Sequence, residues 1–326
     1  MNQTILITGI NECIGQRAAE LAIARGMKVR GLQLVSDKNK SQQQEIEIIT
    51  GDITNFQTVA KACQGVDVVL HAAEMTKEGG KLKDFQKINV DGTITAARAA
   101  SQAGVKTFVH LSSVLVYGFN YCNNITEDGA LKGDNNPYCQ TKIEAEGAVL
   151  KYNNPPEFGV IIIRAGDVYG PGSIPWVVRP VSMMRQNTFA CVNDGKGVMN
   201  HVYVDNLVEA IFLAIEKQPY GEIFNITDGS ETTWKEYFTH LAAIIDLPPP
   251  FSLPKDEIKL FLQLRHQAQK LFRKEADILP ESVDFMTRPY AYSITKAKNI
   301  LNYQPKIDIN KGMQLTKKWL QQQVDS

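Results

Sequence analysis

The sequence lacks an excess of charge of either sign. Its 35 Lys and Arg residues balance 35 Asp and Glu residues, so the formal net charge at pH 7 is zero. A protein that binds nucleic acid or an anionic membrane usually carries a basic excess. We therefore predict no nucleic-acid partner, and the charge gives no indication that a membrane surface is a partner.

Long apolar runs are also missing. No run approaches the ~20 apolar residues that a helix needs to span a bilayer. The N-terminus has no basic stretch followed by a long apolar core, the pattern that is typical of a signal peptide. We therefore expect no integral membrane segment and no signal peptide, and we expect the protein to be cytoplasmic.

Clusters of cysteine or histidine are absent as well. The five cysteines show no CxxC spacing, and the five histidines stand singly in the sequence. This pattern predicts neither a disulfide framework nor a metal site, and it favours free thiols in a reducing compartment. The residues are Cys13, Cys63, Cys122, Cys139 and Cys191, with His71, His110, His201, His240 and His266.

What is present is typical of a globular protein that buries a substantial core. Apolar residues make up 44% of the 326 residues and charged residues 21%, which are ordinary fractions for a soluble domain. The length suits one large domain or two joined ones.

Apolar, β-rich segments alternate with helical patterns over the first half of the chain. Several of the apolar segments are continuous runs, which favour a parallel sheet covered on both faces. We therefore predict a Rossmann-like, doubly wound α/β fold whose ligand lies beyond the carboxyl ends of the strands. The expected strands are 4–9, 27–34, 45–52, 66–73, 106–113 and 158–166, and the expected helices are 14–26, 56–65, 83–104 and 138–152.

The alternating pattern stops after "VYGPG", and the rest of the chain is mixed. It contains a helical pattern from about Trp234 to Ile245, the breaker "LPPP", an amphipathic run at 255–272 and a last helix at 309–323. We predict a Rossmann domain from residues 1–171 plus about 200–218. A smaller, mixed substrate-binding region is predicted from residues 172–199 plus about 219–326.

The stretch "TGINECIG", residues 8–15, connects the first predicted strand to the first helix. A glycine-rich turn in this place usually holds a phosphate at the helix N-terminus. Here the glycines, Gly9 and Gly15, stand only at the two ends, and Glu12 places a carboxylate between them. We expect Glu12 to point away from the ligand and the ligand to bind more weakly than it would with glycine there.

Tyr138 and Lys142 are the first candidates for chemistry. Four residues apart on a predicted helix, they share a face. A cation beside a tyrosine favours the phenolate and lowers its pKa from the usual ~10. Such a tyrosine can pass a proton to or from a substrate oxygen.

Ser113 and Asn89 are the other candidates, and each has two interpretations. Ser113 ends the fifth predicted strand, where its hydroxyl can bind a reacting oxygen or cap the strand end as a turn serine. Asn89 falls inside a predicted helix, where Asn is disfavoured. It therefore serves either a hydrogen bond or bound water, or a plain surface or kink role.

Taken in order, these features resemble the extended short-chain dehydrogenase/reductase superfamily, which includes nucleotide-sugar epimerases, dehydratases and 3β-hydroxysteroid dehydrogenases. The order is the strand–Gly–helix start, "GDIT" after the third strand, "HAA" after the fourth, Asn89, Ser113, and then Tyr138 with Lys142. The later segments "RAGDVYGPG", "HVYVDNLVEA", "GEIFNITDG" and 292–320 also resemble the family.

The resemblance implies hydride transfer between a carbinol carbon and a nicotinamide, with NAD or NADP as cofactor and a small molecule as substrate. It implies that Tyr138 is the acid/base, that Lys142 lowers its pKa and binds the nicotinamide ribose, and that Ser113 holds the substrate oxygen. It also implies a homodimer packed through the helices that hold Asn89 and Tyr138. The implied catalytic set is Ser113, Tyr138, Lys142 and Asn89, and the implied cofactor-binding set is Gly9, Asn11, Glu12, Cys13, Ile14, Gly15, Gln33, Asp52, Ile53, His71, Ala72, Ala73, Tyr138 and Lys142.

On the cofactor side the sequence departs from the family pattern at two places. Family members usually read TGxxGxxG or TGxxxGxG, and Glu12 with Cys13 satisfies neither. The ribose-binding acid falls at about Gln33, followed by Leu34 rather than an arginine. Lys38 and Lys40 are read as solvated loop charges, so the choice between NAD and NADP stays open.

On the substrate side, two residues differ from those of nucleotide-sugar enzymes of the family. Asp167 stands where these enzymes commonly have Asn, and Met199 where they commonly have an Arg. An acid and an apolar residue serve a sugar diphosphate poorly, which favours a less charged alcohol or ketone.

"VYVDN" and the 255–272 run are also similar to the 3β-hydroxysteroid dehydrogenase-like branch. For that run we expect a helix buried in the second region rather than an apolar lid.

Three functions remain after the sequence analysis. The first is an NAD(P)-dependent oxidoreductase for a secondary alcohol or ketone, 3β-hydroxysteroid dehydrogenase-like. The second is a nucleotide-sugar epimerase or dehydratase, and the third is a catalytically silent dinucleotide-binding module. The set of Ser113, Tyr138 and Lys142 favours an enzyme, whereas Glu12 favours the silent module.

Overall fold

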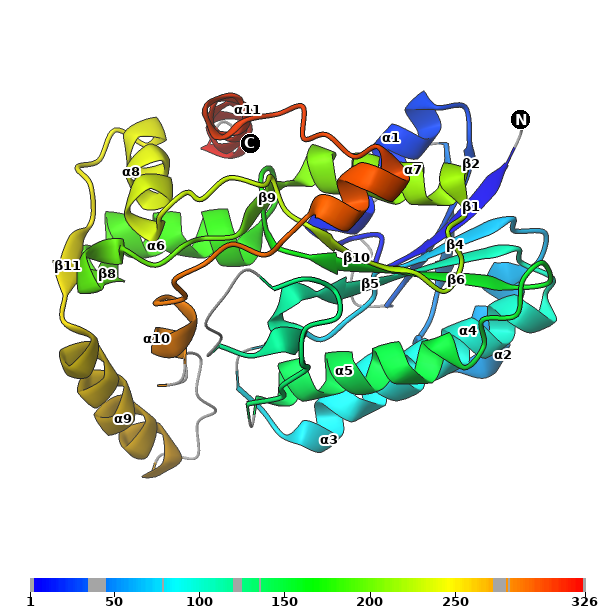
Figure 1. Ribbon diagram of the computed structural model, residues 1–326, viewed down its shortest axis with the longest axis horizontal. Helices are drawn as coiled ribbons and strands as arrows, with labels where there is room; N and C mark the ends of the chain where they lie inside the picture. Colours follow the sequence, from blue (N-terminus) through cyan, green and yellow to red (C-terminus); the bar gives the residue numbers. More distant parts are fainter. Residues whose placement is uncertain are drawn as a thin grey trace.

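The apolar segments of the chain form one parallel sheet at the centre of the molecule (Figure 1). The computed structural model describes residues 3–34, 45–77, 79–119, 125–134, 136–271, 280 and 282–324; Lys38, Lys40 and Cys122 lie outside them. Within these residues the sheet has seven strands in the order β10-β6-β5-β4-β1-β2-β3. They are β1 (Thr4–Thr8), β2 (Lys28–Gln33), β3 (Ile46–Thr50), β4 (Val68–His71), β5 (Thr107–Ser113), β6 (Gly159–Ala165) and β10 (Ile223–Ile226).

Helices cover both faces of this sheet. On one face lie α1 (Cys13–Ala24) and α7 (Val204–Lys217), and on the other α2 (Phe56–Cys63), α4 (Gly92–Gln102) and α5 (Pro137–Leu150) (Figure 1). Each face buries its own apolar cluster. The predicted Rossmann-like, doubly wound α/β fold is therefore confirmed.

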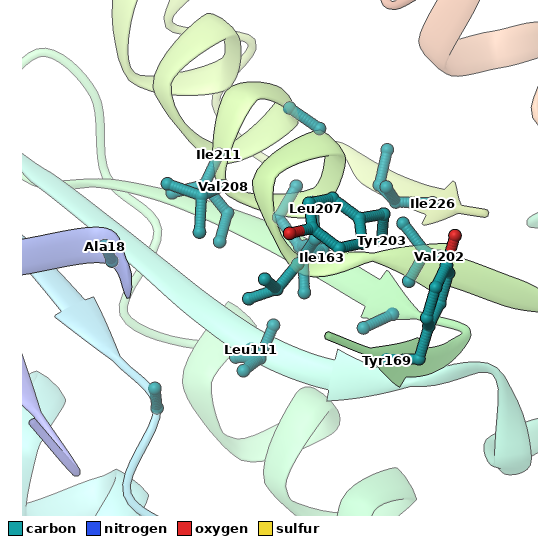
Figure 2. Packing of buried hydrophobic residues seen from close by; sticks show 14 of the residues in the cluster. Ala18, Leu111, Ile163, Tyr169, Val202, Tyr203, Leu207, Val208, Ile211 and Ile226 are labelled. Carbon is teal, nitrogen blue, oxygen red and sulfur yellow. The ribbon is translucent and has the colours of Figure 1, made fainter. Parts of the chain in front are cut away.

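The central strands β5 and β6 are buried along their whole length, as their continuous apolar runs predict. Figure 2 shows how α7 closes one face: Leu207 and Ile211 lie over Leu111 and Ile163 of the two strands. Burying each such side chain contributes about 1.5–3 kcal/mol.

The long helix expected at 83–104 is interrupted. It consists of α3 (Leu82–Phe85), the π-helix η2 (Gln86–Asp91) and α4. A π-helical turn contains more residues than an α-helical turn, so it changes the direction in which the following side chains point. Asn89 lies inside η2 and is buried, and its side chain makes hydrogen bonds, which is the first of the two interpretations given for this residue.

Most of the remaining elements lie beyond one end of the sheet, on the left of Figure 1, whereas η6 (Ala297–Leu301) packs against α7 and β10. They include two small parallel sheets, β7 with β9 and β8 with β11. No helix of the described residues is both long and apolar enough to cross a membrane. The elements are η3 (Val114–Tyr117), β7 (Asp167–Tyr169), η4 (Ile174–Val178), α6 (Arg179–Arg185), β8 (Ala190–Val192), η5 (Asn193–Gly195), β9 (His201–Tyr203), α8 (Trp234–Ile244), β11 (Phe251–Leu253), α9 (Lys255–Leu271), α10 (Ser282–Phe285), η6 (Ala297–Leu301) and α11 (Ile309–Val324).

Two predictions about this region need correction. Residues 223–226 were placed in the substrate-binding region, but as β10 they pair with β6 and extend the central sheet. A strand this short at the sheet edge shows no βαβ pattern of its own. Helix α9 is buried on one side only: Leu262 is 7% exposed, whereas Phe261 is 63% exposed.

A buried network of polar side chains fixes α5 on the sheet. Arg164 of β6 donates from Nε and Nη2 to the two carboxylate oxygens of Glu146 on α5, at 2.9 and 2.7 Å. Ser112 of β5 donates to the same carboxylate at 2.5 Å, and Arg164 Nη1 donates to the Tyr117 hydroxyl at 2.6 Å. Tyr117 donates in turn to Asn225 of β10 at 2.7 Å.

This network predicts a large loss of stability on Glu146→Gln, because Arg164 would keep a buried charge without a counterion. Breaking one side of a buried ion pair costs about 3–5 kcal/mol. Urea denaturation of the variant measures the loss. The matched control is Glu209→Gln, which removes a partly exposed partner of Arg25 and should cost less than about 1 kcal/mol. Equal losses in the two variants would contradict the assigned role of Glu146.

Candidate active site

The candidate site lies where three central strands end side by side. Thr8, His71 and Ser113 are the last residues of β1, β4 and β5, and the three strands are neighbours in the sheet. Ligands of doubly wound sheets bind outside the carboxyl ends of the strands. The residues that follow the ends of these three strands therefore form the candidate site.

The two glycines of the loop after β1 are required for close packing. A Cβ on Gly9, which has a φ of +70°, would lie 2.9 Å from Ala72 O and from the Ala73 backbone. A Cβ on Gly15 would lie 2.2 Å from Gly9 O. The loop, the start of α1 and the end of β4 therefore approach as closely as backbone allows.

The other loop residues leave the start of α1 accessible to an anion. Glu12 is the N-cap residue of α1, makes no side-chain capping bond and is exposed. Cys13 Sγ donates to Pro171 O at 3.1 Å, and burial, with the nearby Glu12 charge, raises the pKa of its thiol to about 12. Asn11 and Ile14 are half-buried beside them. The first N–H groups of a helix have no partner within the helix, so they remain as phosphate donors.

Gln33 and Asp52 occupy the place expected for the adenosine half of a cofactor. Gln33 ends β2, and its Oε1 is buried without a hydrogen-bond partner, which suits a hydroxyl donor such as a ribose. Asp52 Oδ1 accepts from the backbone N and the hydroxyl of Thr54, both at 2.9 Å. Ile53 is 7% exposed and packs beside Gly92. The residues present therefore fit a dinucleotide.

His71 has its side chain in the core and not in the site. Its Nδ1 lies 2.8 Å from Thr8 Oγ1 and its Nε2 lies 3.0 Å from Thr93 Oγ1. Burial, aided by the Lys142 charge, lowers the pKa of His71 to about 3, so the ring is neutral. Thr8 Oγ1 also accepts from the N–H groups of Ala72 and Ala73, at 3.2 and 3.1 Å. If His71 contacts the cofactor, as the resemblance implies, its backbone makes the contact, because its side chain is buried in the core.

Tyr138 and Lys142 lie on the same helix, α5, near its start. Asn136 caps this helix by accepting from the backbone N of Tyr138 at 2.9 Å and of Cys139 at 3.2 Å, and Pro137 occupies the first helical position, where proline is favoured. The sequence "NPY" thus fixes the first turn of the helix beside the end of β5.

Glu74, which the sequence analysis did not select, contacts both residues. Tyr138 Oη donates to Glu74 Oε2 at 3.1 Å, and Lys142 Nζ lies 2.6 Å from the same oxygen. Lys142 Nζ also donates to Leu111 O at 2.7 Å. A charged residue directly after the "HAA" strand end was the sequence signal for Glu74.

This arrangement corrects the expectation that Lys142 lowers the pKa of Tyr138. Burial and then the Glu74 charge raise that pKa well above its usual value, and hydrogen bonding with Ser113 opposes the shift. Tyr138 is therefore a protonated phenol at neutral pH, and the Glu74 carboxylate lies between its hydroxyl and the ammonium group of Lys142.

Ser113 and Asn89 are both buried. Ser113 Oγ accepts from Leu115 N at 3.2 Å, so it caps a turn as well as neighbouring Tyr138. Asn89 holds the backbone of Met75, accepting from its N at 2.7 Å and donating to its O at 3.2 Å, and it donates to Thr141 at 3.1 Å. Its hydrogen bonds thus go to the segment that carries Glu74, which makes Asn89 a positioning residue.

On the substrate side, Asp167 is paired with an arginine from a distant part of the chain. Arg288 Nη2 donates to Asp167 Oδ2 at 2.8 Å, and the two side chains are 0% and 3% exposed. Burial raises the pKa of Asp167, and the Arg288 charge acts in the opposite direction. Met199 is fully buried. The sequence analysis missed Arg288 because nothing in the local sequence indicates this pairing.

The described residues contain no group of three or more His, Cys, Asp or Glu side chains that could hold a metal ion. The four cysteines among them, Cys13, Cys63, Cys139 and Cys191, are free thiols.

The doubly wound parallel sheet, the glycine turn before α1 and the tyrosine and lysine beside β5 define a class, the extended short-chain dehydrogenases/reductases. A sequence model of the NAD dependent epimerase/dehydratase family matches residues 5–227. The chain belongs to this family. It is an NAD(P)-dependent dehydrogenase, reductase or epimerase, and its cofactor is NAD or NADP.

Curated relatives and solved structures agree with this assignment. The chain is 27% identical to sterol-4-alpha-carboxylate 3-dehydrogenase of Candida albicans, over 86% of this chain and 84% of the relative. It is 26% identical to 2-alkyl-3-oxoalkanoate reductase of Stenotrophomonas maltophilia, over 96% and 98%. Identity to dTDP-D-glucose 4,6-dehydratase of Mus musculus is 32%, over 63% and 60%. The fold resembles UDP-glucuronic acid 4-epimerase from Bacillus cereus, with a TM-score of 0.78, 20% identity and coverage of 98% and 100%.

The exposed Glu12 carboxylate predicts that Glu12→Gly and Glu12→Gln both tighten binding of NADH and NADPH. A charge near a helix N-terminus is worth about 0.3–1 kcal/mol, which corresponds to about 2- to 5-fold in Kd. Fluorescence titration measures the change, and the gain should shrink in high salt.

Glu20→Gln is the matched control, because Glu20 lies on the same helix but pairs with Arg17. Unchanged affinity in both Glu12 variants would show that this carboxylate does not act on the phosphates.

Proposed function

We propose that this enzyme transfers a hydride between nicotinamide and a secondary alcohol or ketone of low charge, as 3β-hydroxysteroid dehydrogenases do. The observation that carries the proposal is the position of the Tyr138 hydroxyl, which lies beside Ser113 at the carboxyl ends of the central strands and donates to Glu74. A phenol in this position can donate a proton to a ketone oxygen.

The roles that we propose for the side chains are those that the family resemblance implies. Tyr138 Oη gives its proton to the substrate oxygen during reduction and recovers it during oxidation. Ser113 Oγ hydrogen-bonds that oxygen, and Lys142 binds the nicotinamide ribose. The bound cofactor supplies the hydride chemistry, while the loop from Gly9 to Gly15 and the side chain of Gln33 hold its pyrophosphate and adenosine parts.

An uncharged substrate suits the substrate side of the site. Arg288 and Asp167 neutralise one another, and Met199 is buried, so these positions offer no net charge to a phosphate. Sterol-4-alpha-carboxylate 3-dehydrogenase and 2-alkyl-3-oxoalkanoate reductase match 86% and 96% of the chain, and the substrates in their names carry a carboxylate but no phosphate.

A nucleotide-sugar epimerase or dehydratase is the second candidate. The dTDP-D-glucose 4,6-dehydratase of Mus musculus supports it with the higher identity of 32%, although it matches only 63% of the chain. Against it stands the Arg288–Asp167 pair, because an arginine already paired with a carboxylate has little charge left for a diphosphate. A catalytically silent module is not proposed.

Two further proposals rest on the family resemblance. They are a homodimer packed through the helices that carry Asn89 and Tyr138, and a cytoplasmic location. Light scattering of the purified chain tests the first, since a monomer at micromolar concentration would contradict it.

Tyr138→Phe should abolish turnover of ketones while leaving cofactor affinity nearly unchanged, because it removes only the transferred proton. Loss of a general acid typically costs 10²- to 10⁴-fold in kcat. Turnover is followed by NAD(P)H absorbance with a panel of sterol and alkyl ketones. Tyr152→Phe, just beyond the end of α5, is the control and should turn over normally. Retained turnover in Tyr138→Phe would remove this proposal.

Calorimetric titration with UDP- and dTDP-sugars separates the two candidates. We expect no binding heat in the presence of NAD, because the arginine described on the substrate side, Arg288, is already paired with Asp167. Saturable micromolar binding of any member would replace the first proposal with the second.

A further inference from the structure

We propose that Glu74 is an additional proton-carrying residue of this site, which holds the hydroxyl of Tyr138 and connects it with solvent. The inference rests on the proposed function for Tyr138. The family resemblance does not imply this role for Glu74. It assigns only the preceding residues, His71 to Ala73, to the lining of the cofactor site.

The first support is the geometry around one oxygen atom. Glu74 Oε2 accepts from Tyr138 Oη at 3.1 Å and lies 2.6 Å from Lys142 Nζ. Lys142 is 3% exposed and its second bond goes to Leu111 O, so its ammonium group is enclosed. The Glu74 side chain is 17% exposed. Of these two groups, Glu74 is therefore the one that exchanges protons with water.

The second support is that Glu74 is held in place. Its neighbour Met75 is clamped at both N and O by Asn89, which is anchored on Thr141 of α5. The π-helical turn contains Asn89, and Thr141 lies one residue before Lys142 on α5. Glu74 is thus connected, through Met75 and Asn89, to α5, the helix that also carries Tyr138 and Lys142.

The other groups near the pair are uncharged. Cys139 keeps its proton because burial raises its pKa to about 12. His71 and His110 face Lys142 from β4 and β5 and are neutral, since burial lowers the pKa of each. Ser113 adds a hydroxyl from the end of β5. Among the described residues, the Glu74 carboxylate and the Lys142 ammonium group are the charges for which a contact with Tyr138 is seen.

The proton inventory of ketone reduction follows from these contacts. Tyr138 Oη releases its proton to the substrate oxygen, which forms an O–H bond, and leaves a phenolate beside a carboxylate. Glu74 then takes a proton from water and passes it to the phenolate oxygen. One proton has moved from solvent to the product hydroxyl, and both side chains have returned to their starting states.

Titration of Tyr138 in the cofactor-free protein tests the contact directly. Tyrosine labelled with ¹³C at Cζ is observed by NMR from pH 6 to 11.5, and the Tyr138 signal is assigned by its loss in Tyr138→Phe. In the wild type we expect no ionisation of Tyr138 over this range. In Glu74→Gln we expect its pKa to fall by at least one unit, because an unpaired cation lowers a neighbouring pKa by about 1–3 units, which brings the ionisation into view.

Two variants control this experiment. Glu144→Gln removes a carboxylate on α5 that bonds Gln86 and Gln140 and should leave Tyr138 unionised. Glu74→Asp keeps the charge and should also leave Tyr138 protonated. If Glu74→Gln folds poorly, Glu74→Ala, which also removes the charge, repeats the test. A Tyr138 signal that behaves identically in wild type and Glu74→Gln would overturn the proposal.

The pH profile of turnover supplies a second readout. Alcohol oxidation needs the phenolate, so its alkaline rise should move to lower pH in Glu74→Gln, while ketone reduction near neutral pH should slow several-fold as reprotonation loses its carrier. An unmoved profile would contradict the role of Glu74. If the NMR shift appears but no ketone is reduced by the wild type, the proposed function fails and the Glu74 contact stands.

Discussion

The buried ion pair between Arg164 and Glu146 is the constraint on which the site depends. It joins β6 to α5, and through Ser112 and Tyr117 it also engages β5 and η3. Because Glu146 lies one helical turn beyond Lys142 on α5, the pair fixes both the position and the rotation of that helix. The side chains of Tyr138 and Lys142 reach the strand ends only in this orientation.

Much of the fold could be predicted from the sequence because its signals are local. Continuous apolar runs predicted the parallel strands, helical periodicity predicted the covering helices, and four-residue spacing placed Tyr138 and Lys142 on one face. The same local character explains the errors. The four-residue edge strand β10 carries too little pattern to be recognised, and the exposed Phe261 of α9 belongs to an amphipathic run that we expected to be buried.

The parts of the site that escaped prediction depend on where side chains meet in space. Glu74 follows "HAA" directly, yet its contact with Tyr138 joins residues 64 positions apart. Burial, followed by the charge of Glu74, raises the tyrosine pKa instead of lowering it as expected. Asn89 was selected, but the π-helical turn that directs it towards Met75 has no local sequence signal. Glu12, the residue of the loop that departs from the family pattern, is exposed in the structure, and its orientation relative to a bound ligand stays a prediction.

The pairing of Asp167 with Arg288 also has a consequence for the order of events during synthesis. The two residues are separated by 121 positions, and ribosomes add about 5–20 residues per second. Roughly 6 to 24 s therefore pass between the synthesis of Asp167 and that of its counterion, Arg288. At the start of that interval the nascent chain contains every strand of the central sheet except β10, and β10 is added about halfway through it. The buried ion pair on the substrate side can therefore form only after the whole central sheet has been synthesised.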